Sequence, residues 1–208
     1  MPESLQRSSL GKRLFNVLCH VLVFLALGTL PIPWHEIVGH GLAGVLCGGK
    51  ITRFHVYGLQ FVPDFRWTGP IGGLGICDFT AISQRAQHFN DMAGSMSTFI
   101  VAVVAVFILW RYRPRGLKLT ATLALTLWAT DLMTFTLPSF GTRRYIWSGT
   151  RYAEPYLGAV GLGIPGPVFQ AFVVLSFLAV VVLVILGIRR IVTASVGNKS
   201  MKSKVSAS

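Results

Sequence analysis

Two histidines and a glutamate stand close together in a chain that is otherwise poor in charge. Glu36 directly follows His35, and His40 closes the segment that begins at Trp34. We interpret this segment as a His-Glu-x-x-His pattern on a helix, where positions i and i+4 share a face and both imidazoles can bind one ion. Zinc suits such a pair, because it accepts neutral imidazoles and a carboxylate and keeps a fourth position for water. The predicted chemistry is hydrolysis, with the zinc-bound water as nucleophile and Glu36 as general base.

A third protein ligand would complete this site, and the seven acidic residues of the chain supply the candidates. Asp131 lies well inside an apolar stretch, where an unpaired carboxylate costs about 2.5–3.5 kcal/mol on insertion scales. We therefore expect Asp131 to be the third zinc ligand and keep Glu154 as the reserve candidate. The alternative for Asp131 is a carboxyl group that stays neutral and hydrogen-bonds Thr130 or Thr134 within a helix bundle.

The composition places this site in a membrane protein. Hydrophobic residues make up 52% of the chain and charged residues only 12%, whereas soluble domains carry about 25% charged residues. The formal net charge of +12 lies in short basic clusters beside apolar runs, which argues against nucleic acid as a partner. The three cysteines lack the spacing of a disulfide framework or a zinc knuckle.

Four apolar stretches meet or approach the length of about 20 residues that a membrane-crossing helix needs. They are residues 14–34, 89–110, 118–139 and 160–188. A shorter helical piece from Trp34 to Cys47 carries the histidines, and we expect Pro31 and Pro33 to separate it from the first span. The predicted fold class is an all-α polytopic membrane protein with about four transmembrane helices and this short motif-bearing helix.

Most lysines and arginines lie before the first span, between the stretches at 89–110 and 118–139, and after the last span. If all three clusters face the cytoplasm, as the positive-inside tendency favours, the chain has four spans and both termini are cytoplasmic. An alternative with five spans, in which 34–47 also crosses, carries no orientation signal. We thus expect a multi-pass membrane protein.

Residues 50–88 have a different texture from the apolar stretches. Partial alternation from Thr52 to Val62 suggests short strands or a hairpin, placed at the membrane interface or over a cavity. Gly94, at the start of the next span, fits a contact where two helices approach closely. Residues 1–194 are predicted to form a single membrane domain, and residues 195–208 a basic, disordered tail.

At these residues the chain resembles the site-2 protease family of intramembrane zinc metallopeptidases, and most closely its small bacterial branch. The resemblance covers about residues 30–170. Besides the histidine-glutamate motif it rests on weaker features: a Gly41-Leu42-Ala43 triplet, a Gly48-Gly49 exit, the strand-rich segment, Ala93-Gly94 at the opening of a span, and the span that carries Asp131. Two features depart from the family, because Gly94-Ser95 stands in place of Gly-Pro, and Thr130-Asp131-Leu132 in place of Leu-Asp-Gly.

The resemblance implies that His35, His40 and Asp131 are zinc ligands and that Glu36 activates water. The substrate would be a transmembrane helix cut within or near the bilayer, and the strand-rich segment would help to present it unwound. The predicted function is therefore an intramembrane zinc metallopeptidase of a bacterial cytoplasmic membrane, whose partners are a membrane protein or peptide substrate and the lipid bilayer. Two alternatives are a zinc-binding membrane protein with a structural or assembly role, and a small transporter or metal carrier.

Overall fold

The computed structural model describes residues 3–69, 75–145 and 149–205 of the chain. Within these ranges the protein is mostly helical and carries one small antiparallel sheet of four strands. Three helical segments of the described chain are long and apolar enough to cross a membrane: Leu10–Leu46, Gln84–Tyr112 and Gly166–Ala194. The helical, membrane-type fold with a strand-rich segment is confirmed, but only three of the four expected spans form long helices.

The first candidate span is built from helices that follow one another almost without interruption. They are α1 (Glu3–Thr29), α2 (Pro31–Trp34), η1 (His35–Leu42) and α3 (Ala43–Leu46). The expected separation at Pro31 and Pro33 is wrong, because the chain stays helical through both prolines after a single turn residue, Leu30. The histidine-glutamate segment therefore lies toward the end of the first candidate span.

The two prolines are tolerated because the carbonyl groups that they leave without a helical donor find other partners. Proline has no N–H, so the carbonyl four residues earlier loses its helical hydrogen bond. Here those carbonyls belong to Leu27 and Thr29. The Leu27 oxygen accepts a hydrogen bond of 2.9 Å from the indole Nε1 of Trp128, and the Thr29 oxygen accepts one from the hydroxyl of Tyr57.

The expected span at 118–139 is divided into short helices. They are α5 (Leu117–Thr126), α6 (Ala129–Thr136) and the 3₁₀-helix η2 (Leu137–Phe140). Between α5 and α6, the N–H groups of Leu127 and Trp128 bond carbonyls only three residues back. The hydroxyls of Thr126 and Thr130 also turn back onto the preceding backbone, and such threonine bonds bend helices. The hydropathy of this stretch therefore predicts its burial but not its continuity.

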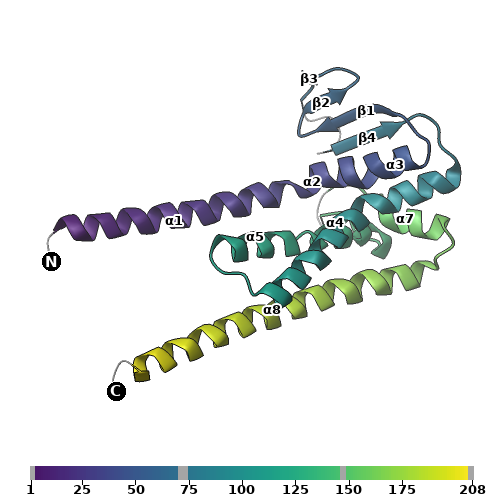
Figure 1. The fold of residues 1–208 in the computed structure, drawn as a ribbon. Helices are drawn as coiled ribbons and strands as arrows, with labels where there is room; N and C mark the ends of the chain where they lie inside the picture. The colour runs from purple at the N-terminus through teal and green to yellow at the C-terminus, as the bar shows by residue number, and fades with distance from the viewer. Residues whose placement is uncertain (1–2, 70–74, 146–148, 206–208) are drawn as a thin grey trace.

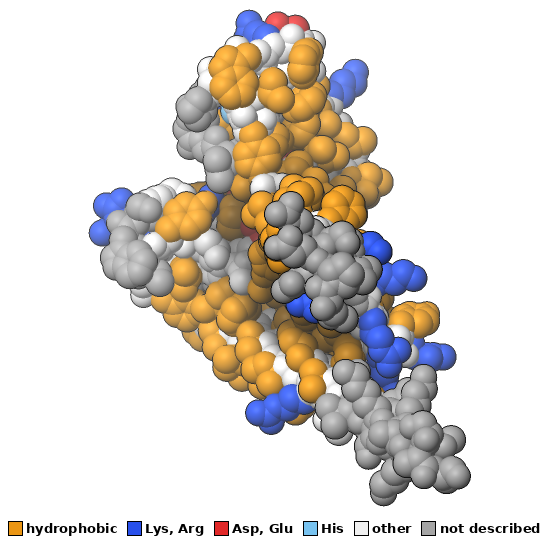
Figure 2. All heavy atoms as spheres, turned by 90° about the vertical axis from the view of Figure 1, so that its left-hand side faces the viewer, with side chains coloured by type: hydrophobic (Ala, Val, Ile, Leu, Met, Phe, Trp, Pro, Cys, Tyr) orange, Lys and Arg blue, Asp and Glu red, His pale blue; other side chains and the backbone are white. Residues whose placement is uncertain are grey.

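Both termini lie at one end of the molecule and the sheet lies at the other (Figure 1). α4 (Gln84–Tyr112) returns from the sheet end, α5 and α6 run toward it again, and α8 (Gly166–Val205) brings the chain back. Figure 2 faces the end with the termini and shows many Lys and Arg side chains but few Asp and Glu.

The sheet occupies most of the segment predicted to be rich in strands. Its strands are β1 (Ile51–Val56), β2 (Leu59–Val62), β3 (Arg66–Trp67) and β4 (Gly75–Phe79). They pair antiparallel in the order β3-β2-β1-β4, so β4 is an edge strand. Gly75, its first residue, pairs with Val56. β4 packs against η1, which brings the sheet next to the histidine-glutamate segment.

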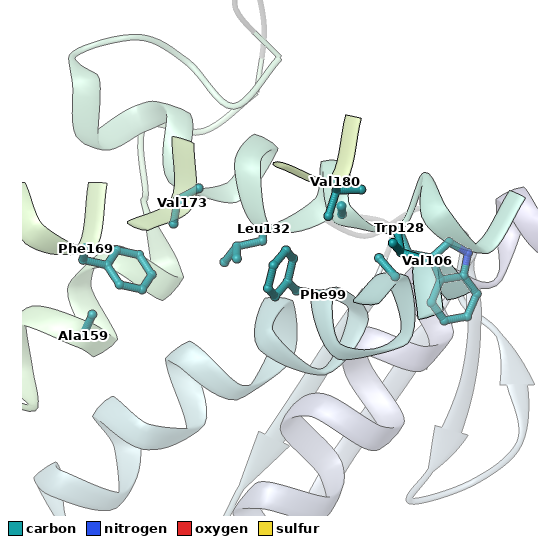
Figure 3. Close-up of a cluster of buried hydrophobic side chains, with 10 residues drawn as sticks. Phe99, Val106, Trp128, Leu132, Ala159, Phe169, Val173 and Val180 are labelled. Atoms are coloured by element: carbon teal, nitrogen blue, oxygen red, sulfur yellow. The ribbon is translucent and has the colours of Figure 1, made fainter. Parts of the chain in front are cut away.

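The apolar core lies between α4, α6, α7 (Glu154–Gly161) and α8. Figure 3 shows Leu132 and Phe99 side by side within it, and Phe169 and Val173 of α8 belong to the same cluster. Since Leu132 directly follows Asp131, core packing fixes the helix that carries this carboxylate. α8 is longer than predicted, because residues 195–205 continue it as a helix where we expected a disordered tail. Residues 206–208 of that tail lie outside the described chain.

Candidate metal centre

The two histidines are five residues apart, so our interpretation of the segment as a His-Glu-x-x-His pattern is wrong by one residue. On an α-helix a step of five residues would place the side chains about 140° apart. The structure forms a π-helix, η1, over the eight residues His35–Leu42, and hydrogen bonds from i to i+5 bring residues five apart onto one face. The imidazole centroids of His35 and His40 are consequently 4.8 Å apart. The π-turn absorbs the additional residue.

Each imidazole is oriented through its Nδ1 atom. The Nδ1 of His35 lies 2.8 Å from Oδ2 of Asp131, and the Nδ1 of His40 lies 2.9 Å from the backbone carbonyl oxygen of Asn90. A carbonyl and a carboxylate can only accept, so both Nδ1 atoms carry the hydrogen. In the neutral rings the Nε2 atoms therefore present their lone pairs. Metal-binding histidines are commonly oriented by such a hydrogen bond to the second nitrogen.

Three electron-pair donors converge at the Nε2 side. The group of His35, His40 and Glu154 offers ligand atoms that all lie within 4.8 Å of one another. The two Nε2 atoms are 3.0 Å apart, and the carboxylate oxygens of Glu154 lie 3.9 Å from that of His35 and 3.4 Å from that of His40. Ligands at about 2.0–2.2 Å from a tetrahedral zinc ion are about 3.3–3.6 Å apart. The three distances surround that range.

The donor set therefore fits a divalent cation. Two lone pairs and a carboxylate that face one another at these distances repel unless a positive charge lies among them. Burial raises the pKa of the Glu154 carboxyl, and the charge of Arg144 acts in the opposite direction and lowers it. Two imidazoles and a glutamate form a known zinc donor set.

Gly94 of α4 keeps open the space beside the two Nε2 atoms. A Cβ at this position would lie 2.5 Å from Nε2 of His35 and 2.6 Å from Nε2 of His40. One turn of η1 touches the same glycine, because a Cβ on Gly39 would collide with the Gly94 backbone, 2.9 Å from its carbonyl oxygen. The close approach expected at Gly94 is present, and it serves the histidine pair as well as the helix contact.

Asp131 lies at the site but on a different side from the one expected for a third ligand. Its Oδ2 faces Nδ1 of His35 and accepts a second hydrogen bond, of 2.8 Å, from the hydroxyl of Thr98 on α4. The structure brings Glu154, the reserve candidate, to the Nε2 side instead. The two partners expected for a structural carboxyl, Thr130 and Thr134, are replaced by Thr98 and the imidazole. Asp131 is therefore placed to orient the imidazole of His35.

Glu36 is buried beside the sheet. A Cβ on Gly75 at the start of β4 would meet the Glu36 side chain, at 2.6 Å from Oε1 and 2.8 Å from Cδ. The charges of Glu154, Asp131 and Arg144 act on it, so the Glu36 carboxylate belongs to the same cluster. The sheet thus packs over Glu36, the only acidic residue of η1. It does so at a glycine, which leaves room for the carboxylate.

Comparisons with protein-family models, with curated proteins and with solved structures found no match to this chain.

Proposed function

We propose that this protein is an intramembrane zinc peptidase of the site-2 protease type, with His35, His40 and Glu154 as metal ligands. One observation carries the proposal: two imidazoles whose Nδ1 atoms are already engaged direct their Nε2 atoms toward each other and toward a glutamate. Glu154 takes the ligand role that we first assigned to Asp131. Glu36 is the general base.

The division of labour follows from the side chains. A bound zinc ion would lower the pKa of a water to about 7 and polarise the scissile carbonyl. Glu36, one residue from a ligand, accepts the proton of the attacking water and returns it to the amide nitrogen that leaves. Asp131 holds His35 in the tautomer whose Nε2 is free to bind metal. Burial of the cluster excludes competing water and strengthens these interactions.

The proposed setting is the lipid bilayer, with a membrane protein or peptide as substrate. Three candidate spans and many exposed apolar side chains along α1 and α8 support this setting. Both termini and the basic loop after α4 lie toward the same end of the molecule (Figure 1), which supports a multi-pass arrangement with cytoplasmic termini in a bacterial cytoplasmic membrane. The edge strand β4 next to Glu36 supports a peptide as the substrate.

The Glu36→Gln variant tests the chemistry separately from the metal. We expect the purified protein to keep stoichiometric zinc and to lose about 10²–10⁴-fold in cleavage of a fluorescence-quenched transmembrane peptide. Zinc is read by elemental analysis of protein in detergent micelles. Unchanged cleavage would exclude the general-base role. Zinc retention without any cleavage by the unmodified protein would favour the structural or transport alternatives.

A second pair of variants tests the ligand assignment. Glu154→Ala removes a carboxylate on the Nε2 side and should abolish stoichiometric zinc binding, as should His40→Ala. Asp78→Ala is the matched control, because its carboxylate pairs with Arg53 at 2.6 Å in the sheet. If Glu154→Ala binds zinc like the unmodified protein, Glu154 is not a ligand and the donor set has to be assigned again.

A further inference from the structure

One cation stands beside the candidate metal centre on the loop that leads to Glu154. The guanidinium of Arg144 lies over the ring of Phe135, with Cζ 3.6 Å from the ring centroid. The same ring stacks against the imidazole of His35, with centroids 4.6 Å apart and an interplanar angle of 35°. Phe135 thus connects the guanidinium to a proposed metal ligand.

The N–H donors of Arg144 form no ion pair with a carboxylate of the described residues. Its charge acts on both Glu36 and Glu154, yet among the described residues it forms no ion pair with either. Its Nε is buried and has no hydrogen-bond partner in the described chain. A guanidinium carries five N–H donors, so this half-buried one beside the candidate metal centre is available to a ligand that brings an acceptor.

The backbone of Arg144 is held in place, whereas its guanidinium keeps N–H groups for a ligand. The N–H of Arg144 donates to the carbonyl of Thr150 at 3.0 Å and closes the base of the loop. The neighbouring Arg143 is exposed, and its Nη1 donates a hydrogen bond of 3.3 Å to the carbonyl oxygen of Gly149. These adjacent arginines therefore differ in role, and Arg143 offers a matched control for Arg144.

The net charge of the site favours a cation at the position of Arg144. Glu36, Asp131 and Glu154 are three carboxylates, so a divalent ion leaves one negative charge uncompensated, which Arg144 balances. Attack on an amide adds a further negative charge at the carbonyl oxygen. Fixed donors that face such a developing charge in a site with little water stabilise the transition state more than the ground state.

We propose that Arg144 is a catalytic residue that contacts the carbonyl oxygen of the scissile peptide bond. The water oxygen bonds to the carbonyl carbon, its proton passes to Glu36, and the electron pair of the C=O double bond moves onto the oxygen that faces Arg144. When the C–N bond breaks, that pair returns and the proton on Glu36 goes to the leaving nitrogen. The inference rests on the proposed peptidase function, and its test separates the two.

The experiment compares Arg144→Gln with Arg143→Gln by cleavage kinetics, zinc content and binding of a phosphinic dipeptide isostere, whose anionic oxygens mimic the attacked carbonyl. We expect Arg144→Gln to keep zinc, to lose about 10²–10³-fold in kcat with a small change in KM, and to bind the phosphinate more weakly by a similar factor. Arg143→Gln should match the unmodified protein. Arg144→Lys, which keeps the charge but lacks the fork, should recover part of both losses.

Three results would overturn the assignment. Loss of zinc in Arg144→Gln that Arg144→Lys restores would make the arginine a countercharge for the ligands. If Arg144→Gln kept the kcat and the phosphinate affinity of the unmodified protein, a contact with the oxygen would be excluded. Equal losses in Arg143→Gln would show that any positive charge on this loop has the same effect. If the zinc-loaded protein cleaves nothing, yet phosphinate binding still depends on Arg144, the peptidase proposal fails while the anion contact stands.

Discussion

The candidate metal centre draws on two regions that are built differently. His35 and His40 come from a single π-turn that packs on α4, and their side chains are 3% and 7% exposed. Glu154 opens a short helix after an irregular loop, and its side chain is 21% exposed. The histidine side is thus held rigidly by backbone contacts, whereas the glutamate side is the more open. Arg144 precedes Glu154 on the same loop, so the proposed contact with the substrate carbonyl lies on the open side.

The largest effect should come from breaking the rigid side without changing a ligand. Gly94→Ala places a methyl group beside both Nε2 atoms, so we expect loss of stoichiometric zinc although every donor remains. Elemental analysis and zinc titration measure it. Gly28→Ala is the control, since a Cβ there meets nothing within 4 Å. Normal zinc binding in Gly94→Ala would show that this space is not where the ion lies.

A smaller effect should follow when the sheet displaces the proposed base. Gly75→Ala brings a methyl group against the Glu36 carboxylate, so kcat should fall by about 10²-fold, the lower end for a general base, while zinc is retained. The double variant with Glu36→Gln is the control, because residues that act through one group are not additive. A further loss of kcat in the double variant would mean that Gly75 acts independently of Glu36.

The smallest effect should come from Asp131, which supports a ligand from the opposite side. Asp131→Asn weakens the hydrogen bond to Nδ1 of His35, and loss of such a partner typically costs 10–100-fold in metal affinity. Zinc competition with a chelator measures this against the unmodified protein. Complete loss of zinc, as in Glu154→Ala, would restore Asp131 as a ligand and reverse the ranking of the two carboxylates.

These differences explain what could be predicted from the sequence. The clustering of His35, Glu36 and His40 is local, and so is the strand alternation before Val62. The π-turn could not be predicted, because it forms together with the contact of Gly39 on the backbone of Gly94, which lies 55 positions further along the chain and comes close only on folding. The sequence signal for it is the five-residue spacing itself, which an α-helix cannot bring onto one face.

The third ligand was harder to predict for a different reason. Asp131 and Glu154 both approach His35, and hydropathy favours the residue inside the apolar stretch. Which carboxylate faces Nδ1 and which faces Nε2 depends on the packing of α6 and α7, where Leu132 and Ala159 enter one core. The threonine-rich break between α5 and α6 likewise escapes an average over hydropathy, although back-bonding threonines are a recognisable signal.

The paired prolines of the first span have a consequence for how this protein holds together. Because the prolines lack two N–H groups, the carbonyl oxygens of Leu27 and Thr29 accept hydrogen bonds from Trp128 and Tyr57 instead. These two donors come from the α5–α6 junction and from the turn between β1 and β2. Each of these two carbonyl oxygens can accept a hydrogen bond either from its own helix or from a neighbouring element. A first helix with better internal bonding would be less firmly joined to its neighbours.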